Sequence, residues 1–384
     1  METVKEGSID IKNGTMAFLR GMTDPGVLQM VAIFILAGAF AGMAKGIGAV
    51  DATVSAALGF IPGSMIYAGL FLTACIISFS VGTSVGTIAA VVPIACGIAT
   101  DTGISLPFVV GIVVGGAFFG DNLSFISDTT LAVTKAMGVK MNDKFKANFL
   151  TVLPAVAITL AIYVFAGLSA DITVPQMEAP QAAKLIPYIL VIVLALCGIG
   201  VIKILFIGIA ACACVGLATA APGSAMGPLA ADMALDAWAG IKGMISVIIV
   251  ALVAGGILNI IKEAGWFDRF TEWMMGVVKT KRGAMSSVAG MVAVTNALTA
   301  NNTVAIITVG GVAKLIADRY ELNPRKTAGI MDMFSCLTQS LLPYGAQLLM
   351  ASAFAGIAPF SIIPWLFYPF LMGICATISI LRIK

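Results

Sequence analysis

Gly120-Asp121-Asn122-Leu123-Ser124-Phe125-Ile126-Ser127-Asp128-Thr129-Thr130 is the stretch that decides the fold of this chain. It contains two carboxylates, one amide, two serines and two threonines, and the sequence leading into it is apolar over the length of a helix. Inside a lipid bilayer such groups need a polar partner or a water-filled cavity, so the run is functional by default. The pattern predicts the unwound middle of a discontinuous transmembrane helix, where secondary transporters hold their ions.

The composition of the whole chain is that of a membrane protein. Of its 384 residues 60% are hydrophobic and 11% are charged, and the mean hydropathy is +1.04. A soluble domain of this size would have no means of solvating such a surface, so we expect an all-α polytopic membrane protein with no nucleic-acid partner. The chain has no histidine. Imidazole proton relays are therefore excluded, and any proton chemistry falls to Asp or Glu.

The two halves of the chain resemble each other when one is shifted by 217 residues. The coincidences, which need no gap, are Ala37-Gly38 with Ala254-Gly255, Lys45 with Lys262, Gly48 with Gly265, Asp51 with Asp268, Asp101 with Asp318, Pro107 with Pro324 and Leu131 with Leu348. With the parallel hydropathy of the halves, they predict two structural repeats. The alternative is that two apolar sequences align by chance.

Each repeat shows the same order of segments. A span (27–44; 244–261) is followed by a surface piece (45–60; 262–279), two apolar arms around a polar tip (Ser80–Thr87; Thr299–Thr303), an interrupted helix (104–137; 324–354) and a plain span (146–167; 360–381). Short apolar arms that meet at polar residues indicate a re-entrant hairpin. The predicted fold therefore has two repeats, each with a re-entrant hairpin and a discontinuous helix.

The number of crossings indicates that the two repeats are inverted. Residues 185–221 are apolar apart from Lys203 and suffice for two spans of about 20 residues each. If hairpins do not cross, five crossings separate equivalent points, and an odd number inverts the copies. The side that holds residues 1–26 then collects 19 of the 22 Lys and Arg residues, those of the loop 135–146 among them. By the positive-inside rule that side is the cytoplasm, so both termini are expected there in the cytoplasmic membrane.

Four segments follow from this pattern. Residues 1–26 are a cytoplasmic or surface segment, 27–167 are repeat 1, 168–243 are two linking spans and a surface segment of repeat 2, and 244–384 are the core of repeat 2. The second repeat is preceded by two spans, and the first repeat has no counterpart of them. We therefore expect the natural polypeptide to carry two more helices ahead of Met1; the alternative is a shortened variant completed by a partner chain.

Asp121 and Asp128 are the leading candidates for ion chemistry. Carboxylates, hydroxyls and freed main-chain carbonyls suit a hard cation, so we expect Na⁺ at Asp121, Asn122 and Asp128. Burial disfavours an ionised carboxylate and a bound cation favours it, so a proton and a cation compete for one group. The alternative is that either aspartate only caps a half-helix.

The candidate ion- or substrate-binding residues belong to four clusters. They are Asp121, Asn122, Ser124, Ser127, Asp128 and Thr129 at the first break, Thr83, Ser84 and Thr87 at the first hairpin tip, Asn301, Asn302 and Thr303 at the second, and Asp332 and Gln339 in the second interrupted helix. For Asp332 the alternative is pairing with a Lys or Arg from a loop. For each Ser or Thr it is a bond to its own backbone.

Two of these runs resemble a known family. Gly116-Ala-Phe-Phe-Gly-Asp-Asn-Leu-Ser-Phe-Ile-Ser-Asp-Thr-Thr130 and Ser80-Val-Gly-Thr-Ser-Val-Gly-Thr87 are similar to motifs of NhaC-type sodium/proton antiporters, within the wider ion-transporter superfamily. The resemblance implies a location in the cytoplasmic membrane, cation/proton exchange without a cofactor, and often a homodimer. It places Asp121, Asn122, Ser124, Ser127 and Asp128 in the family's central motif. Relatives of this family also exchange organic acids or carry amino acids.

Three functions are compatible with these residues. The first is a Na⁺/H⁺ antiporter using Asp121, Asp128 and Asp332, favoured because no buried basic residue is expected to receive an anionic substrate. The second is a Na⁺- or H⁺-coupled transporter of small carboxylates or amino acids, since the hairpin tips offer backbone N–H groups to a carboxylate. The third, an intramembrane aspartyl protease, is disfavoured because Phe119-Gly120-Asp121 lacks a further glycine. We expect a transporter and no enzyme.

Overall fold

The computed structural model describes residues 11–60, 62–124, 127–170, 181–197, 199–220, 226–265, 269, 272–273, 276, 278 and 280–383. Every regular element in these ranges is helical. The elements are α1 (Ile11–Met22), α2 (Pro25–Gly46), α3 (Ala49–Phe60), η1 (Gly63–Met65), α4 (Ile66–Val81), α5 (Ser84–Thr102), α6 (Leu106–Leu123), α7 (Asp128–Met137), α8 (Met141–Ser169), α9 (Ala182–Leu196), α10 (Val201–Ala218), α11 (Met226–Glu263), α13 (Lys281–Thr299), α14 (Asn302–Arg319), α15 (Pro324–Leu341), α16 (Ala346–Ala355), α17 (Pro359–Ile362), η2 (Ile363–Trp365) and α18 (Phe367–Leu381).

Several of these helices are long enough to span a bilayer. Six stretches in the described part of the chain qualify by length and composition: Pro25–Gly46, Ser84–Thr102, Leu106–Met137, Met141–Ser169, Val201–Ala218 and Gly227–Glu263. A seventh is added if Pro324–Ala355 and Pro359–Trp365, which meet at 96°, count as one span. The prediction of an all-α polytopic membrane protein is confirmed. Helix α5, assigned from sequence to a hairpin arm, is itself long enough to cross.

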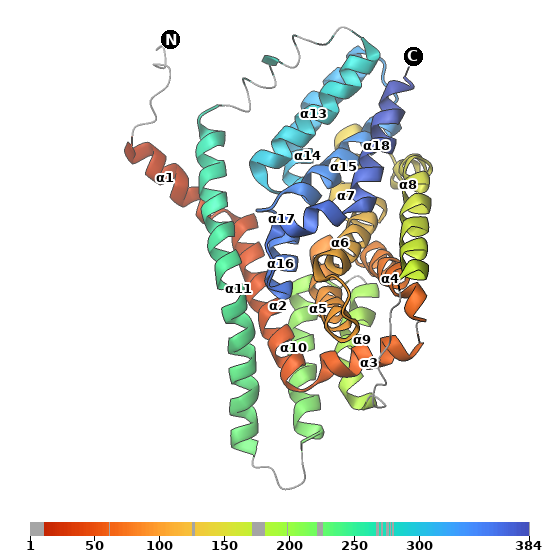
Figure 1. Cartoon of the computed structure of the whole chain (residues 1–384). Helices are drawn as coiled ribbons and strands as arrows, with labels where there is room; N and C mark the ends of the chain where they lie inside the picture. The colour runs from red at the N-terminus through yellow and green to blue at the C-terminus, as the bar shows by residue number, and fades with distance from the viewer. Residues whose placement is uncertain are drawn as a thin grey trace.

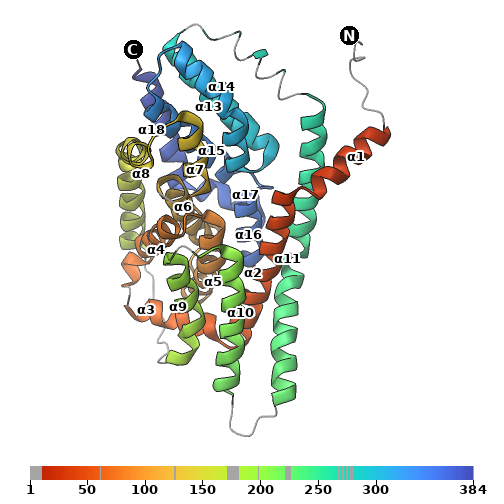
Figure 2. The same ribbon diagram turned by 180° about the vertical axis from the view of Figure 1, so that it is seen from behind.

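Helices α2 and α11 make the most extensive helix–helix contact in the described part of the chain. The two run antiparallel along one edge of the molecule (Figures 1 and 2). Glycine allows their backbones to touch, because a Cβ atom on Gly38 would lie 2.7 Å from the carbonyl oxygen of Gly240. Gly255 is the counterpart of Gly38 under the 217-residue shift, but it approaches α1 instead. A Cβ atom on Gly21 of α1 would lie 2.3 Å from the carbonyl oxygen of Gly255. Close approach at small residues is the usual way in which membrane helices associate.

The hairpin turns recur at equivalent points of the two halves. Helix α4 ends and α5 begins around Gly82, which has a φ of 71°. Helix α13 ends and α14 begins around Ala300, which has a φ of 49°. Each turn has one residue with a left-handed backbone conformation, which glycine adopts without strain and which strains alanine.

The interrupted helices recur in the same way. Helix α6 ends at Leu123 and α7 begins at Asp128, while α15 ends at Leu341 and α16 begins at Ala346. These boundaries are related by a shift of 218, one more than the sequence coincidences, which is within the scatter of helix ends. In both views α13 and α14 lie at the upper end of the molecule, whereas α3, α9 and α10 lie at the lower end (Figures 1 and 2).

Two segments differ from the sequence expectation, and two others lie partly or wholly outside the described residues. Residues 231–243, expected as a surface segment, continue into the span 244–261 as the single helix α11. The plain span expected at 360–381 is interrupted, because Pro364 lies in the turn η2 and α18 begins only at Phe367. Residues 1–10 and half of the predicted surface piece 262–279 lie outside the described residues.

Candidate functional site

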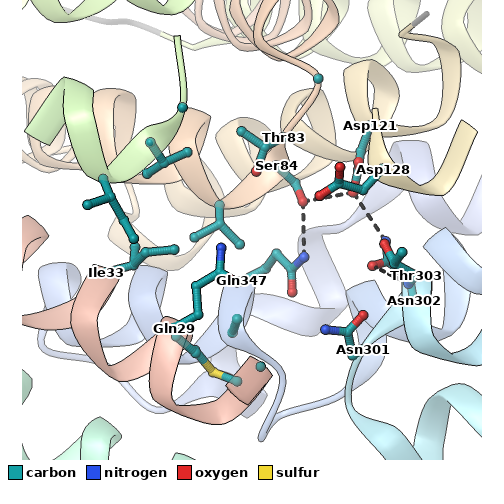
Figure 3. A pocket seen from close by; sticks show the side chains of 18 of the residues that line it. Gln29, Ile33, Thr83, Ser84, Asp121, Asp128, Asn301, Asn302, Thr303 and Gln347 are labelled. Atoms are coloured by element: carbon teal, nitrogen blue, oxygen red, sulfur yellow. Dashed lines mark hydrogen bonds between the residues drawn. The ribbon is translucent and has the colours of Figure 1, made fainter. Parts of the chain in front are cut away.

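A cavity of about 1170 Å³ opens where the two hairpin tips meet the first helix break. Its wall is formed by the starts of α5 and α14, the end of α6, the first residue of α7, and parts of α2 and α16. Figure 3 shows polar side chains from these elements facing one another across it. The cavity therefore lies where the helices α6 and α15 are interrupted.

Asp121 lies at the base of this cavity, in the last turn of α6, and only 6% of its surface is exposed. Its Oδ2 atom accepts hydrogen bonds from the Ser84 hydroxyl at 2.9 Å and the Asn302 amide at 3.2 Å. Its Oδ1 atom accepts from the Ser127 hydroxyl at 2.8 Å. The three donors come from the first hairpin, the second hairpin and the helix break, and Figure 3 shows the first two of them, Ser84 and Asn302. Asp121 thus joins all three polar segments, and each of these partners is neutral.

Two glutamines extend this network from the second interrupted helix. The Gln347 amide donates to the Ser84 hydroxyl at 3.0 Å (Figure 3). The carbonyl oxygen of Gln347 accepts from the Gln339 amide at 2.9 Å, and Gln339 also donates to the main-chain oxygen of Ala300 at 3.1 Å. The two hairpin tips are therefore joined by side chains that α15 and α16 supply.

Asp128 supplies a second carboxylate to the cavity. It is the first residue of α7, its side chain is exposed, and it lies beside Asp121 in Figure 3. Asn301 and Thr303 face the cavity from the start of α14, where the Asn301 side chain caps the helix by accepting from Val304 N at 3.0 Å. Capping is thus the observed role of Asn301, whereas Asp128 faces the cavity.

The structure divides the fourteen predicted site residues into two groups. Those that line the cavity are Thr83, Ser84, Asp121, Asp128, Asn301, Asn302, Thr303 and Gln339. Those buried behind it are Thr87, Asn122, Ser124, Ser127, Thr129 and Asp332. Of this second group, Ser127 and Thr129 still contact Asp121, since the Thr129 hydroxyl bonds Ser127 and the Asp121 main chain. Thr87 bonds its own backbone at Thr83 O.

Asn122 turns away from the two aspartates with which it was grouped as a Na⁺ ligand. Its side-chain amide donates to Asp332 Oδ2 at 2.9 Å. Asp332 lies in the middle of α15, is fully buried, and does not line the cavity. Asn122 and Asp332 therefore belong to a second polar cluster behind Asp121.

Lys144 is the centre of that second cluster, and the sequence analysis misassigned it. Its ammonium nitrogen lies 2.5 Å from Asp332 Oδ2, and its side chain is only 1% exposed. It also donates to the main-chain oxygen of Asn122 at 2.5 Å and to the Thr130 hydroxyl at 2.7 Å. The expectation that the chain has no buried basic residue is wrong, and Asp332 shows the alternative given for it, pairing with a lysine of the loop 135–146. Lys144 belongs to the first turn of α8 and points into the protein, so it is no solvent-facing charge of the loop 135–146.

Three further residues were missed or misjudged. Asn148 donates to Asp332 Oδ2 at 3.2 Å, and nothing in the sequence marked it, because the first two turns of α8 also contain Asn142, Asp143, Lys144 and Lys146. Gln347 could have been found as a polar residue just after the second break. Lys203, which the sequence analysis assigned to no site, lines the cavity from the first turn of α10. Its signal was a single charge in 37 apolar residues.

The arrangement offers two different environments for a cation. Asp121 is an anion held by neutral donors at the base of an accessible cavity, so a cation or a proton from solution has to balance its charge. Asp332 is an anion whose charge a lysine already balances. Such a site is suited to reversible cation binding at Asp121.

The whole chain is similar to proteins of one transporter family. A model of the family "Na+/H+ antiporter family" matches residues 2–168 and 177–383. The Na(+)/H(+) antiporter NhaC of Bacillus subtilis (strain 168) is 25% identical over 96% of this chain and 84% of its own length. The arginine/ornithine antiporter ArcD of Halobacterium salinarum is 26% identical over 93% of this chain and 80% of its own.

Two further matches are partial or distant. The malate-2H(+)/Na(+)-lactate antiporter of Bacillus subtilis is 29% identical over 44% of this chain and 38% of its own. The solved structure of the YdaH transporter of Alcanivorax borkumensis covers 97% of this chain and 89% of its own, with a TM-score of 0.45 and 13% identity. The family model, by contrast, matches nearly the whole chain. The chain therefore belongs to the Na⁺/H⁺ antiporter family, a family of membrane transporters and not of enzymes.

Proposed function

We propose that this protein exchanges Na⁺ for H⁺ across the membrane and that Asp121 is the carboxylate for which the two ions compete. The observation that carries the proposal is the set of partners around Asp121. Ser84, Ser127 and Asn302 orient the carboxylate without neutralising it. A buried anion without a fixed countercharge is costly, so it binds either a proton or a cation at any moment.

The geometry also gives Na⁺ a set of ligands. Na⁺ prefers oxygen atoms, and a hydroxyl that donates to Asp121 still has lone pairs directed elsewhere. Ser84, Thr303 and the exposed carboxylate of Asp128 present such oxygens to the cavity beside Asp121. Asp128 draws cations into the cavity, and Asp121 holds the ion that is exchanged. Asn122 is no longer among the proposed ligands, because its amide binds Asp332.

Exchange requires that the site face each side of the membrane in turn, and inverted repeats supply a simple basis for that. We infer that residues 27–167 and 244–384 are such repeats, linked by 168–243. The recurrence of the hairpin and helix breaks at a shift of 218 supports the duplication. The antiparallel course of α2 and α11, which hold the equivalent spans 27–44 and 244–261, supports the inversion.

We also propose how the protein is oriented in the membrane and how it assembles. Both termini face the cytoplasm of a cell membrane, because the excess of Lys and Arg lies on that side. The hairpins α4–α5 and α13–α14 are re-entrant, since their tips lie at the cavity and not at opposite ends of the molecule. Assembly into homodimers is proposed on the family resemblance alone, and the mass of the protein in detergent or nanodiscs tests it.

Transport in proteoliposomes tests the exchange directly. Vesicles with an acidic interior and an internal pH dye are given Na⁺, with choline at equal ionic strength as the control. Na⁺ should dissipate the gradient in the wild type, and Asp121→Asn should abolish the response. Asp128→Asn should need more Na⁺ for the same response. No Na⁺ response in a wild-type protein of verified orientation would refute the proposal.

A second function is favoured by the size of the cavity. A volume of about 1170 Å³ exceeds what one Na⁺ and its hydration shell require and lies just above the usual range of small-molecule sites. Its wall carries acidic Asp121 and Asp128 and basic Lys203, so a small solute with both charges fits it. Exchange of an amino acid or a small carboxylate is therefore the alternative. Loading vesicles with amino acids and carboxylic acids, with Na⁺ and H⁺ varied independently, separates the two functions.

A further inference from the structure

Lys144 makes an unusual set of contacts for a residue in a salt bridge. An ammonium group has three protons, and all three of its acceptors are present: a carboxylate oxygen of Asp332, the main-chain oxygen of Asn122 and the hydroxyl of Thr130. A carboxylate, a main-chain carbonyl and a hydroxyl form the ligand set that a hard cation would choose. The lysine nitrogen thus occupies a cation site that the protein itself has built.

The position of these ligands relates the site to the broken helix. Asn122 belongs to the last turn of α6, where main-chain carbonyls lack an intrahelical partner, and Thr130 belongs to the first turn of α7. One nitrogen atom therefore binds both sides of the break. Asp332 on α15 closes the cluster from the second repeat, and Asn148 on α8 donates to the same carboxylate oxygen.

The cluster also has oxygen atoms to spare. Asp332 Oδ1, Asn122 Oδ1 and Asn148 Oδ1 are buried and have no hydrogen-bond partner within the described part of the chain. Unpaired buried acceptors are rare and costly in proteins. The cluster therefore contains more hydrogen-bond acceptors than the donors around it satisfy.

We propose that the Lys144 ammonium group is a tethered cation that fills a second cation site and holds the two halves of the interrupted helix together. This site lies behind Asp121 and is formed by Asp332, Asn122 O and Thr130. Lys144 is a positioning residue: it fixes the break from which Asp121, Ser127 and Asp128 reach the cavity. Under the proposed function, Asp121 alone carries the exchanged ion, and Asp332 stays neutralised throughout the cycle.

Vacating the site tests the proposal. Lys144→Ala removes the tethered cation and leaves room for a free one, whereas Lys144→Met removes the charge and leaves little room. Both are combined with Asp121→Asn, which weakens Na⁺ binding at Asp121, so Asp121→Asn alone is the reference for the measurement. The readout is the melting temperature of purified protein in Na⁺ against choline at equal ionic strength.

We expect Na⁺ to raise the melting temperature of Asp121→Asn/Lys144→Ala by several degrees. Na⁺ should have no such effect on Asp121→Asn alone or on Asp121→Asn/Lys144→Met. Adding Asp332→Asn to the Lys144→Ala protein should remove the effect, because the anionic ligand is lost. Methylammonium, which supplies an ammonium group in place of the one removed, should also stabilise the protein with the vacated site. Stabilisation by methylammonium without stabilisation by Na⁺, or by neither, overturns the proposal.

A second measurement applies if Lys144→Ala does not fold. Lys144→Ala/Asp332→Asn removes both charges of the buried pair and leaves neither unpaired. If Lys144 joins the two half-helices, amide hydrogen exchange at residues 127–131 should rise at least tenfold in this variant, while α14 stays protected. Unchanged exchange at 127–131 refutes the positioning role. These readouts need no transport, so the proposal survives if the wild type proves to carry a solute other than Na⁺, and it fails independently of that result.

Discussion

Replacing Asp121 by Asn tests the competition between Na⁺ and H⁺ quantitatively. Asp121 is the one carboxylate of the described chain that combines burial, access to the cavity and neutral partners. If one Na⁺ displaces one proton from it, the Na⁺ concentration for half-maximal binding rises about tenfold for each unit by which pH falls, as long as the free site is protonated. Two competing carboxylates would give about a hundredfold rise per pH unit.

The asparagine variant loses this dependence and binds Na⁺ more weakly. The amide replaces one anionic oxygen by an NH₂ group, which then meets a donor from Ser84, Ser127 or Asn302. Loss of one charge-assisted contact costs about 1.5–3 kcal/mol, which weakens Na⁺ binding about 10- to 150-fold. The assay is the Na⁺-dependent melting temperature between pH 5 and 9, with choline balancing ionic strength. Asp128→Asn is the matched control, and it should bind Na⁺ more weakly but keep the tenfold slope. A tenfold slope that persists in Asp121→Asn refutes the assignment.

Three further predictions concern the stability of the helix packing and of the hairpin turns. Gly120→Ala should destabilise the protein by about 1–3 kcal/mol or prevent folding, because the added Cβ would lie 2.2 Å from Phe79 N. Gly115→Ala on the same helix is the control: its Cβ would have its nearest contacts at 3.7 Å, so the melting temperature should change little. Equal effects of the two alanines would contradict the packing argument. Ala300→Gly should raise the melting temperature, since left-handed backbone costs alanine about 1 kcal/mol, and Gly82→Ala at the equivalent turn should lower it; the same sign for both would speak against equivalent turns. Gln347→Leu breaks the bridge between the hairpin tips and should cost about 1–3 kcal/mol in a denaturation assay, whereas a neutral outcome would show that the bridge is dispensable.

Sequence reasoning identified the helix break because its chemistry is incompatible with lipid. Carboxylates and amides within apolar sequence have few permitted environments in a bilayer, so Asp121, Ser127 and Asp128 were predictable as a polar centre. The hairpin tips were predictable for the same reason, and Ser84 and Asn302 do contact Asp121. These signals are local, since each depends only on which residues lie within one segment.

The partners of the buried charges were decided by the tertiary structure. Lys144 follows a basic loop in sequence, and nothing local distinguishes it from Lys140 or Lys146, which are exposed. Its burial depends on how α8 packs against α6, α7 and α15, elements that are up to 188 residues away in the case of Asp332. Asn122 is the next residue after Asp121 and yet belongs to a different cluster. Successive side chains of a helix point in different directions, so Asn122 faces Asp332 on α15 while Asp121 faces the cavity. The sequence by itself thus determined that polar groups sit within the membrane, whereas only the packing of the helices decided which charge is balanced by a lysine and which is left for an ion from solution.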